Sequence, residues 1–149
     1  MLVEPEIAWN TGNVGRTALA LGAELHLVGK LGYELDDKNV RRAGLDYWRH
    51  VAVHRWADLA QLEAAALGRS YLFSASAPRS FWDAAFEDPC VLVFGKESEG
   101  LGPALVGREA DTYSIPQSSS HIRSLNLSTA VGVVGYEAAR QHRGRSAMM

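Results

Sequence analysis

The sequence predicts an α/β fold in which a mostly parallel sheet carries helices on both of its faces. Short apolar runs recur along the chain at the spacing of strand–helix units, and helical patterns separate them. Glycine follows two of the helical patterns, at Gly22 and Gly68, where a left-handed residue commonly ends a helix. Strands that alternate with helices favour parallel pairing, because each crossover returns the chain to the same end of the sheet.

The expected elements follow one another without a linker, a repeat or a low-complexity tract, and we expect one domain over residues 1–149. Apolar runs predict strands at residues 2–3, 25–28, 51–54, 71–75, 91–94 and 112–115. Helical patterns predict helices at residues 11–21, 56–67 and 81–86, and one or two helical turns at residues 38–43.

The last predicted helix, from residue 125 onward, has apolar and small residues all around its axis. One sheet face covers only one side of such a helix, so a second cover is needed. Gly132 and Gly135 allow another backbone to approach closely, at a cost of about 1 kcal/mol each in helix propensity. We therefore expect a homodimer through this helix. In the alternative, the helix is simply central in the monomer.

Composition and charge exclude several classes of protein. A chain of 149 residues, 47% hydrophobic and 21% charged, is typical of one globular domain. It has no apolar run of membrane-spanning length and no signal-peptide pattern, so we expect a cytoplasmic protein without a membrane. The single cysteine, Cys90, fits a buried residue in a reducing compartment. The net charge of −2 argues against a wholly basic nucleic-acid binder, although Lys and Arg in residues 38–55 predict a local positive surface.

Three loops occupy positions where such sheets bind ligands, beyond the carboxyl ends of the strands. They are NTGNVGR at residues 10–16, GKESEGLG at residues 95–102 and PQSSSHIRS at residues 116–124. In the first loop, Asn10 or Thr11 is a candidate helix N-cap, and free backbone N–H groups there favour an anion. Arg16 lies about one turn further on and could contact a phosphate through two hydrogen bonds. The alternative is a solvent-facing arginine on a capped helix.

The glycine-rich second loop matches neither G-x-G-x-x-G nor the phosphate-binding pattern G-x-x-x-x-G-K-[ST]. Glu97 and Glu99 lie inside it and would repel a polyphosphate, so a ligand without phosphate, or with a positive centre, is a better match. An ordinary connecting loop is the alternative. In the third segment, Ser124, Asn126 and Ser128 supply polar groups near the start of the last helix. The histidines lack metal-ligand spacing and only one cysteine is present, so no metal site is predicted.

Four motifs, taken together in this order and at this spacing, carry a resemblance to a known family. They are NTGNVGR, KNVRRAGLDYW, VFGKESEGL and an IP pair followed by RSLNLSTAVGVVGYEA. In combination they resemble the SPOUT class of RNA methyltransferases, and more narrowly the TrmL (YibK-type) tRNA 2′-O-methyltransferases, over residues 4–141. The resemblance implies a homodimer and a C-terminal trefoil knot, a rare exception to the rule that chains are unknotted.

The resemblance also implies a reaction, methylation of the 2′-hydroxyl of the wobble nucleotide of tRNA, cytidine or uridine at position 34. The implied methyl donor is S-adenosyl-L-methionine (AdoMet), and the product is S-adenosyl-L-homocysteine (AdoHcy). AdoMet carries a sulfonium cation and no phosphate, which agrees with a pocket that contains Glu97. Carried over by motif, the residues that line the cofactor pocket are Ala75, Ser76, Gly95, Glu97, Gly100, Ile115, Ser124 and Leu125.

The same resemblance implies roles around the acceptor ribose. Arg16 matches the arginine that the class places at this point, and it is a reluctant base because its pKa exceeds about 12. We therefore expect Arg16 to hold a phosphate and orient the hydroxyl, while the phosphate or a water takes the proton. The other expected catalytic residues are Asn126, Ser128 and Tyr136, of which Tyr136 reaches the site from the dimer interface. The expected RNA contacts, which would bind the anticodon stem-loop, are Asn10, Arg16, Lys38, Arg41 and Arg42.

Two alternatives stay open on the sequence alone. One is a 2′-O-methyltransferase that acts on another tRNA position or on rRNA. The other is a knotted RNA-binding dimer that performs no chemistry. Such a dimer would have no physical need for Arg16, the glycine-rich loop and the polar residues 124–128 together, so the sequence favours an enzyme.

Overall fold

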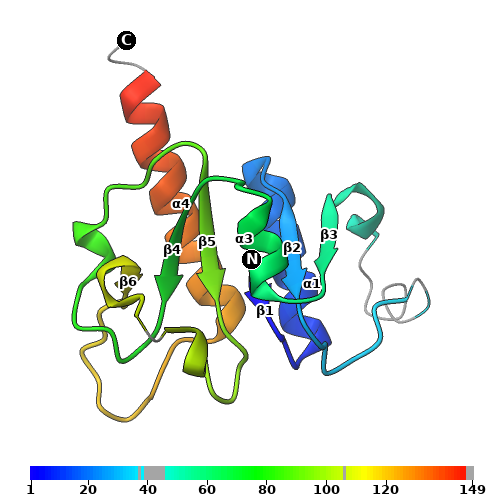
Figure 1. Ribbon diagram of the computed structural model, residues 1–149, viewed down its shortest axis with the longest axis horizontal. Coiled ribbons are helices and arrows are strands. Elements are labelled where there is room, and N and C mark those ends of the chain that lie inside the picture. The colour runs from blue at the N-terminus through cyan, green and yellow to red at the C-terminus, as the bar shows by residue number, and fades with distance from the viewer. Residues whose placement is uncertain (37, 39–45, 106, 147–149) are drawn as a thin grey trace.

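The computed structural model describes residues 1–36, 38, 46–105 and 107–146, and these contain one six-stranded sheet (Figure 1). The strands are β1 (Leu2–Val3), β2 (Leu25–Val28), β3 (Val53–Trp56), β4 (Arg69–Phe73), β5 (Cys90–Phe94) and β6 (Thr112–Tyr113). Their order in the sheet is β3-β2-β1-β5-β4-β6, and each neighbouring pair is parallel. The predicted α/β class with a mostly parallel sheet is therefore confirmed. The trefoil knot stays a prediction.

Helices cover both faces of this sheet, as the alternation of strands and helices predicts. The α-helices of the described residues are α1 (Ala8–Leu21), α3 (Leu59–Ala64) and α4 (Leu127–Ser146). In Figure 1, α1 and α4 lie behind the sheet and α3 lies in front of it. The helices α1 and α4 also pack against each other. A Cβ atom on Gly135 would lie 2.8 Å from Leu21 Cδ1, so the absence of a side chain there lets the helices approach closely.

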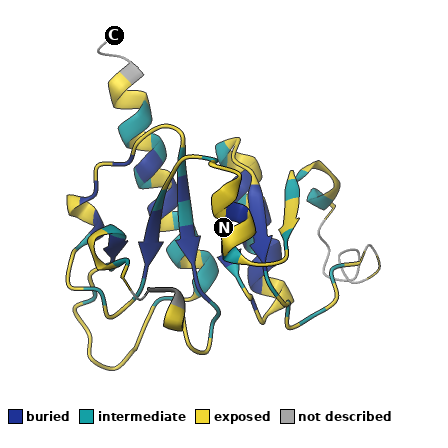
Figure 2. Cartoon of the chain, in the orientation of Figure 1, coloured by how far each residue is buried: buried dark blue, intermediate teal, exposed yellow. Residues whose placement is uncertain are grey.

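The core divides along the two faces of the sheet because strand side chains alternate in direction. On the face toward α1 and α4, Tyr71 and Phe73 of β4 join a cluster with Val14 and Val134. On the other face, Leu72 packs in a second cluster with Val91, Val93 and Leu101. Figure 2 shows these strands as the buried centre of the molecule, with exposed loops around them. No helix of the described residues is long and apolar enough to cross a membrane.

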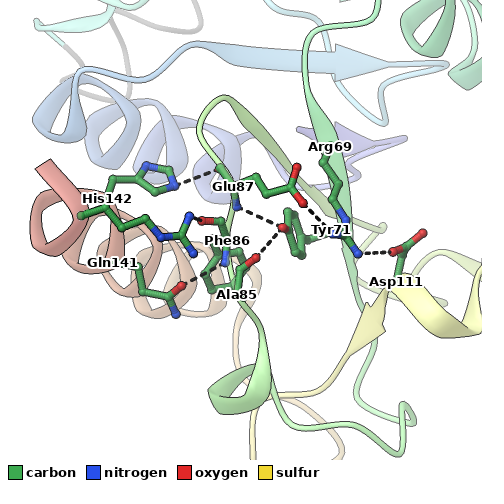
Figure 3. Close-up of polar contacts among 9 residues, drawn as sticks. Arg69, Tyr71, Ala85, Phe86, Glu87, Asp111, Gln141 and His142 are labelled. Carbon is green, nitrogen blue, oxygen red and sulfur yellow. Dashed lines mark hydrogen bonds and ion pairs between the residues drawn. The ribbon is translucent and has the colours of Figure 1, made fainter. Parts of the chain in front are cut away.

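Polar contacts fix the second half of α4 to the segment that precedes β5 (Figure 3). Phe86 donates its backbone N–H to Gln141 Oε1 over 2.9 Å, and His142 Nε2 lies 2.9 Å from Glu87 O. Tyr71, on β4, donates to Ala85 O over 2.6 Å and accepts from the Glu87 backbone N–H over 3.0 Å. These contacts hold the second half of α4 against the segment before β5.

Two of the predicted helices differ from the structure by more than a few residues at their ends. Residues 56–67 contain only the short α3, because Trp56 continues strand β3 and Asp58 accepts from Gln61 N as the N-cap. Residues 81–86 form a single 3₁₀ turn, Phe81–Asp83. The predicted turns at residues 38–43 lie almost wholly outside the described residues.

The helix α4 is less buried in one chain than its sequence suggests. Val134 and Ala138 are buried against the core, whereas Val133 is 40% exposed and Tyr136 is 57% exposed. Its sheet-facing side is covered and its outer side is not, so the need for a second cover remains.

Candidate functional site

The strands all run in one direction, so their carboxyl ends meet at one edge of the sheet. At this edge, loops after β4, β5 and β6 and the starts of α1 and α4 enclose a cavity of about 500 Å³. Small-molecule sites commonly have volumes of about 300–1,000 Å³. The cavity lies where the strand order reverses, between β1 and β5, which is the usual ligand position in an open parallel sheet.

The structure brings the predicted cofactor residues together. All of them line this cavity, and Asn10 and Asn126 line it too. The predicted set is Ala75, Ser76, Gly95, Glu97, Gly100, Ile115, Ser124 and Leu125. Glu99, the other carboxylate that the sequence indicated in the glycine-rich loop, lines the cavity as well. The lining residues that the sequence did not single out are Ile7, Phe73, Ser74, Phe94, Lys96, Ser98, Gln117, Arg123, Leu127 and Ala130. Most of these residues are next to a predicted residue in the chain. Their position in a loop after a strand was therefore the signal from which they could have been predicted.

The glycine-rich loop folds back on itself after β5. Lys96 N donates to Gly100 O over 3.2 Å, and Gly100 N donates to Lys96 O over 2.9 Å. A Cβ atom on Gly95 would lie 2.0 Å from the Gly100 carbonyl carbon, so the turn has no room for a side chain there. Gly100 itself has a φ of +66°, which favours glycine. The turn brings Glu97 and Ser98 against the segment before α1.

Two carboxylates hold these segments together, and we call Glu6, Ile7, Glu97 and Ser98 the Glu6–Glu97 clasp. Glu97 accepts hydrogen bonds from the backbone N–H groups of Glu6 (2.7 Å) and Ile7 (3.2 Å). In return, Glu6 accepts from the backbone N–H and the hydroxyl of Ser98, both at 2.9 Å. The bonds from Ser98, the backbone bond first, lower the pKa of Glu6. The anion favoured at the start of α1 is thus supplied by the chain itself, as Glu97.

Asn10 and Asn126 extend this set of contacts along the cavity wall. Asn10 donates from Nδ2 to Glu97 Oε1 and accepts at Oδ1 from Asn126 Nδ2, both over 3.1 Å. Asn126 Oδ1 in turn accepts from the backbone N–H groups of Ser128 (2.9 Å) and Thr129 (3.4 Å). Asn126 is therefore the N-cap of α4. The starts of α1 and α4 and the glycine-rich loop are joined by side chains that face the cavity.

The prediction that Asn10 or Thr11 is the N-cap of α1 is wrong. The helix begins at Ala8, and the N-cap position, Ile7, makes no capping hydrogen bond with its side chain. Asn10 and Thr11 are buried in the first turns, at 4% and 0% exposure, and the Thr11 hydroxyl accepts from the Tyr33 hydroxyl. The backbone donors before the helix are satisfied instead by the clasp, whose carboxylate is distant in the sequence.

Arg16 does not line the cavity. Its exposed side chain lies on α1, with the guanidinium carbon 4.8 Å from the centre of the Tyr47 ring. Tyr47 donates to Gly12 O over 2.9 Å, which fixes the ring against the helix. Burial raises the pKa of Tyr47, and the charge of Arg16 opposes this shift. Arg16 is thus an exposed cation supported by an aromatic face, outside the enclosed part of the site.

Of the remaining predicted residues, those that the structure describes are not in the cavity lining either. Ser128 is half-buried and donates its hydroxyl to Asn126 Oδ1 over 2.7 Å, next to the lining but not part of it. Tyr136 lies two turns further along α4 and is 57% exposed. Lys38 is exposed. The expected RNA contacts Arg41 and Arg42 lie outside the described residues.

The charges of the cavity lining suit a ligand without phosphate. Lys96 is neutralised by Glu99 (3.3 Å) and Glu4 (3.7 Å), and Glu97 adds a further carboxylate to the lining. The charged lining residues, Lys96 and Arg123 against Glu97 and Glu99, balance, so the wall lacks the net positive charge that favours a polyphosphate. Gln117 lines the same cavity, and its buried Oε1 has no hydrogen-bond partner in the described part of the chain.

A second polar cluster, which histidine spacing alone did not reveal, lies at the start of β2 and β3. Glu24 Oε2 is 3.3 Å from His26 Nε2 and 3.0 Å from His54 Nε2. Trp56 Nε1 donates to His26 Nδ1 over 2.9 Å, so the proton of a neutral His26 is on Nε2 and faces Glu24. Burial lowers the pKa of His26 and favours this neutral form. The cluster is a hydrogen-bonded one, and none of its members lines the cavity.

Comparisons with known proteins agree with this geometry. The sequence profile of the SpoU rRNA Methylase family matches residues 1–136. A tRNA (cytidine(34)-2'-O)-methyltransferase of Burkholderia pseudomallei is 47% identical over 146 residues, which cover 95% of this chain and 93% of the relative. A solved structure concerned with the 2-OH methylation of C/U34 on tRNA has a TM-score of 0.87 and 44% identity, over 96% of this chain and 94% of that chain. The SpoU methyltransferase AviRb from Streptomyces viridochromogenes, solved with AdoMet, has a TM-score of 0.79 and 27% identity, over 95% of this chain and 56% of that chain.

Proposed function

Because the chain belongs to the SpoU rRNA Methylase family, we propose that it methylates the 2′-hydroxyl of nucleotide 34, the wobble position, of tRNA with AdoMet as donor. The observation that carries this function is the cavity, since the loops that enclose it are those that carry the family's motifs. The Burkholderia relative and the C/U34 structure support the choice of substrate, because each matches almost the whole chain. In this proposal, residues 1–149 act as one domain in the cytoplasm, and the C-terminal region carries the trefoil knot.

The residues present fit AdoMet by size, charge and shape. The proposed contacts are Ala75, Ser76, Gly95, Glu97, Gly100, Ile115, Ser124 and Leu125. When bound, AdoMet supplies an electrophilic methyl group on a sulfonium cation. Gly95 and Gly100 expose backbone to the ligand, and Ile115 and Leu125 exclude water from it. Glu97, held in the clasp, keeps a carboxylate beside the cavity. Positioning of this kind can supply most of the catalysis, since it replaces a bimolecular encounter by a fixed geometry.

The acceptor nucleotide is proposed to bind at the rim of the cavity. Arg16 binds a phosphate there and orients the hydroxyl, and the phosphate or a water takes the proton because an arginine is a poor base. Asn126 and Ser128 contact the sugar or the backbone of the RNA. Lys38, Arg41 and Arg42, with Asn10 at the cavity, are proposed to contact the anticodon stem-loop, mainly through phosphates. Binding should then weaken as salt rises.

A second copy of the chain is proposed to cover α1 and α4. Large apolar side chains remain exposed on this packed pair of helices: Trp9 (60%) and Leu19 (38%) on α1, and Val133 (40%) and Tyr136 (57%) on α4. Exposed apolar groups gathered on one region mark interaction surfaces, and twofold pairing of identical chains is the commonest solution. In the dimer, Tyr136 would approach the partner's site. Light scattering should find a dimer for the wild type and a monomer for Val133→Asp.

The decisive experiment measures transfer of labelled methyl groups from AdoMet into total tRNA from a strain that lacks wobble methylation, followed by nucleoside digestion. Label in 2′-O-methylcytidine or 2′-O-methyluridine from position 34 is the expected result, and Arg16→Ala should abolish it. Undermethylated rRNA is assayed in parallel. Label in rRNA alone, or in another tRNA position, would reassign the substrate. A folded dimer that binds AdoMet but transfers no label would favour a non-catalytic RNA-binding protein.

A further inference from the structure

In the described part of the chain, three arginine side chains lie over the face of a tyrosine ring. The pairs are Arg16 with Tyr47, Arg69 with Tyr71, and Arg79 with Tyr113. In two pairs the arginine also uses its donors within the chain, since Arg69 donates to Glu87 and Asp111 and Arg79 donates to Ala110 O. Arg16 makes no hydrogen bond or ion pair with a described residue. Its N–H groups lie in the plane of the guanidinium, so a ring against its face leaves them all available to a ligand.

The ring of Tyr47 is itself fixed on α1 in two ways. Its hydroxyl donates to Gly12 O over 2.9 Å. Tyr47 also comes directly before a 3₁₀ turn, η1 (Trp48–His50), which packs on α1. A Cβ atom on Gly15 would lie 2.4 Å from Trp48 Cζ3, so the absence of a side chain there lets the indole approach the helix closely. The aromatic pair of the KNVRRAGLDYW motif is thus held against the NTGNVGR motif.

We propose that Tyr47 is a positioning residue for Arg16, whose guanidinium it holds at the rim of the cavity with the N–H groups directed to a phosphate of the RNA. The inference rests on the proposed function, since it takes RNA as the ligand of Arg16. Arg16 lies six residues after Asn10, about 9 Å further along the helix axis, and Asn10 lines the cavity. A nucleotide bound at the cavity could therefore extend to Arg16.

The ring contributes by reducing what Arg16 loses on binding. A long side chain that is immobilised by a ligand loses rotamer freedom, and this loss weakens binding. An arginine that already lies over a fixed ring loses less, and its planar set of donors is then oriented before the phosphate arrives. Neither Tyr47 nor Arg16 lines the cavity, so this effect should concern the RNA and leave the cofactor unaffected. A merely structural tyrosine would act whether or not Arg16 is present.

The test is a double-mutant cycle on RNA binding by the full chain. Fluorescence anisotropy measures the Kd of a fluorescein-labelled tRNA transcript with cytidine at position 34, in the presence of saturating AdoHcy. Tyr47→Leu should weaken binding about 3- to 10-fold, and Arg16→Ala about tenfold or more. The double variant should bind within twofold of Arg16→Ala alone, because Tyr47 acts through Arg16. Tyr47→Phe keeps the ring face and should bind within about twofold of the wild type.

Two controls separate positioning from damage to the fold. Arg69→Ala removes the arginine of a similar pair at the first residue of β4, the opposite end of the strand from the cavity, and should keep the wild-type Kd for tRNA. Calorimetry with AdoHcy should give every variant an affinity within twofold of the wild type. Tyr47→Met is measured beside Tyr47→Leu, so that the result does not depend on the folding of one variant.

Wild-type affinity of both Tyr47→Leu and Tyr47→Met for tRNA would overturn the role of Tyr47 and leave the proposed function intact. The same loss with and without Arg16, or a loss of AdoHcy affinity, would overturn it too, because Tyr47 would then be structural only. A wild-type chain that binds AdoHcy but no tRNA would overturn the RNA substrate and this inference together. Coupling between Tyr47 and Arg16 in a chain that binds tRNA but transfers no label would support the inference and overturn the proposed reaction alone.

Discussion

The starts of α1 and α4 both border the cavity, yet they are held in different ways. At α4, the N-cap Asn126 accepts from backbone N–H groups two and three residues ahead of it. At α1, the backbone donors just before the helix are satisfied by Glu97, which lies 91 residues further along the chain from Glu6. One helix start is thus capped by a residue of its own segment, and the backbone donors before the other are paired by a residue of the glycine-rich loop.

The difference shows where the shape of the cavity comes from. A cap within one helix is present wherever that helix forms, since donor and acceptor are neighbours in the chain. The Glu6–Glu97 clasp, by contrast, joins two segments that are distant in the sequence and that meet because β1 and β5 pair in parallel. Asn10 then connects the clasp to Asn126 and to α4. The starts of α1 and α4 and the glycine-rich loop therefore build the cavity together. Of the contacts that join them, those of Glu97 should be the most sensitive to mutation.

The largest effect should come from Glu97→Ala, which removes the remote contact. Three hydrogen bonds end on this carboxylate, and each hydrogen bond to a charged group contributes roughly 1.5–3 kcal/mol. Because the carboxylate is partly exposed, we expect a loss of about 2–3 kcal/mol in the free energy of unfolding. Methyl transfer should fall more than 100-fold. Urea unfolding and the labelled transfer assay measure the two effects.

The matched control for this variant is Glu99→Ala. Glu99 lies on the same loop, but its side chain is 72% exposed, and among the described residues its carboxylate forms an ion pair only with Lys96. A surface ion pair contributes little, so stability should change by less than about 0.5 kcal/mol. If Glu97→Ala and Glu99→Ala behave alike, the clasp does not hold the start of α1.

Asn126→Ala should have the second largest effect, because it removes a local cap and the bond to Asn10 at once. The loss of an N-cap costs about 1 kcal/mol, and the unpaired Asn10 oxygen raises the total to about 2 kcal/mol. Asn126→Asp separates the two contributions, since it keeps the capping oxygen and loses the donor to Asn10. Chemical denaturation should place Asn126→Asp between the wild type and Asn126→Ala. Equal stability of both variants would mean that the Asn10 contact alone matters.

The contrast between local and remote contacts also explains which parts of the molecule could be read from sequence. The predicted strand bounds agree with the observed ones within a few residues, because an apolar run is a local feature of the sequence. The loops after them gave residues that line the cavity, since in a parallel sheet the loops after the strands all lie at the same edge. The predicted start of α1 was wrong because the group that pairs with the backbone before the helix, the Glu97 carboxylate, is distant in the sequence. The end of β3 at Trp56 was missed because pairing with Val28 overrides the local helical pattern.

Other features could not be derived from any pattern in the sequence. The orphaned oxygen of Gln117 depends on how residues 115–117 turn after β6, and a glutamine in a polar loop gives no signal of burial. The cluster of Glu24, His26 and His54 depends on the register of β2 against β3, which sets His26 opposite His54. The role of Arg16 stays a prediction, and its position over the Tyr47 ring, outside the cavity lining, could not be read from the sequence.

A smaller effect is expected at α3, whose start is local and distant from the cavity. Asp58 accepts from Gln61 N over 2.8 Å, and Gln61 Oε1 accepts from Ala57 N over 2.8 Å, a reciprocal capping arrangement. Asp58→Ala should cost about 1 kcal/mol in the free energy of unfolding. Methyl transfer and AdoHcy affinity should stay at the wild-type values. A loss of transfer in this variant, with the chain folded at the assay temperature, would contradict the view that only the contacts at the cavity shape the site.

The smallest effect, and the one that tests the clasp most directly, is its dependence on pH. The pKa of Glu6 in the folded chain lies below its ordinary value of 4.5, chiefly because the Ser98 backbone N–H donates to the carboxylate. A lowered carboxyl pKa stabilises the fold fully at pH values above 4.5 and ceases to do so as the pH falls through the folded value. Glu6→Gln should therefore lower the Tm at pH 7 and have progressively less effect below pH 4.5. Ser98→Ala keeps the backbone donor and should retain most of this pH dependence. A Tm difference between wild type and Glu6→Gln that stays constant from pH 7 to pH 3 would show that Glu6 is not held by Ser98, and the clasp would then consist of Glu97 alone.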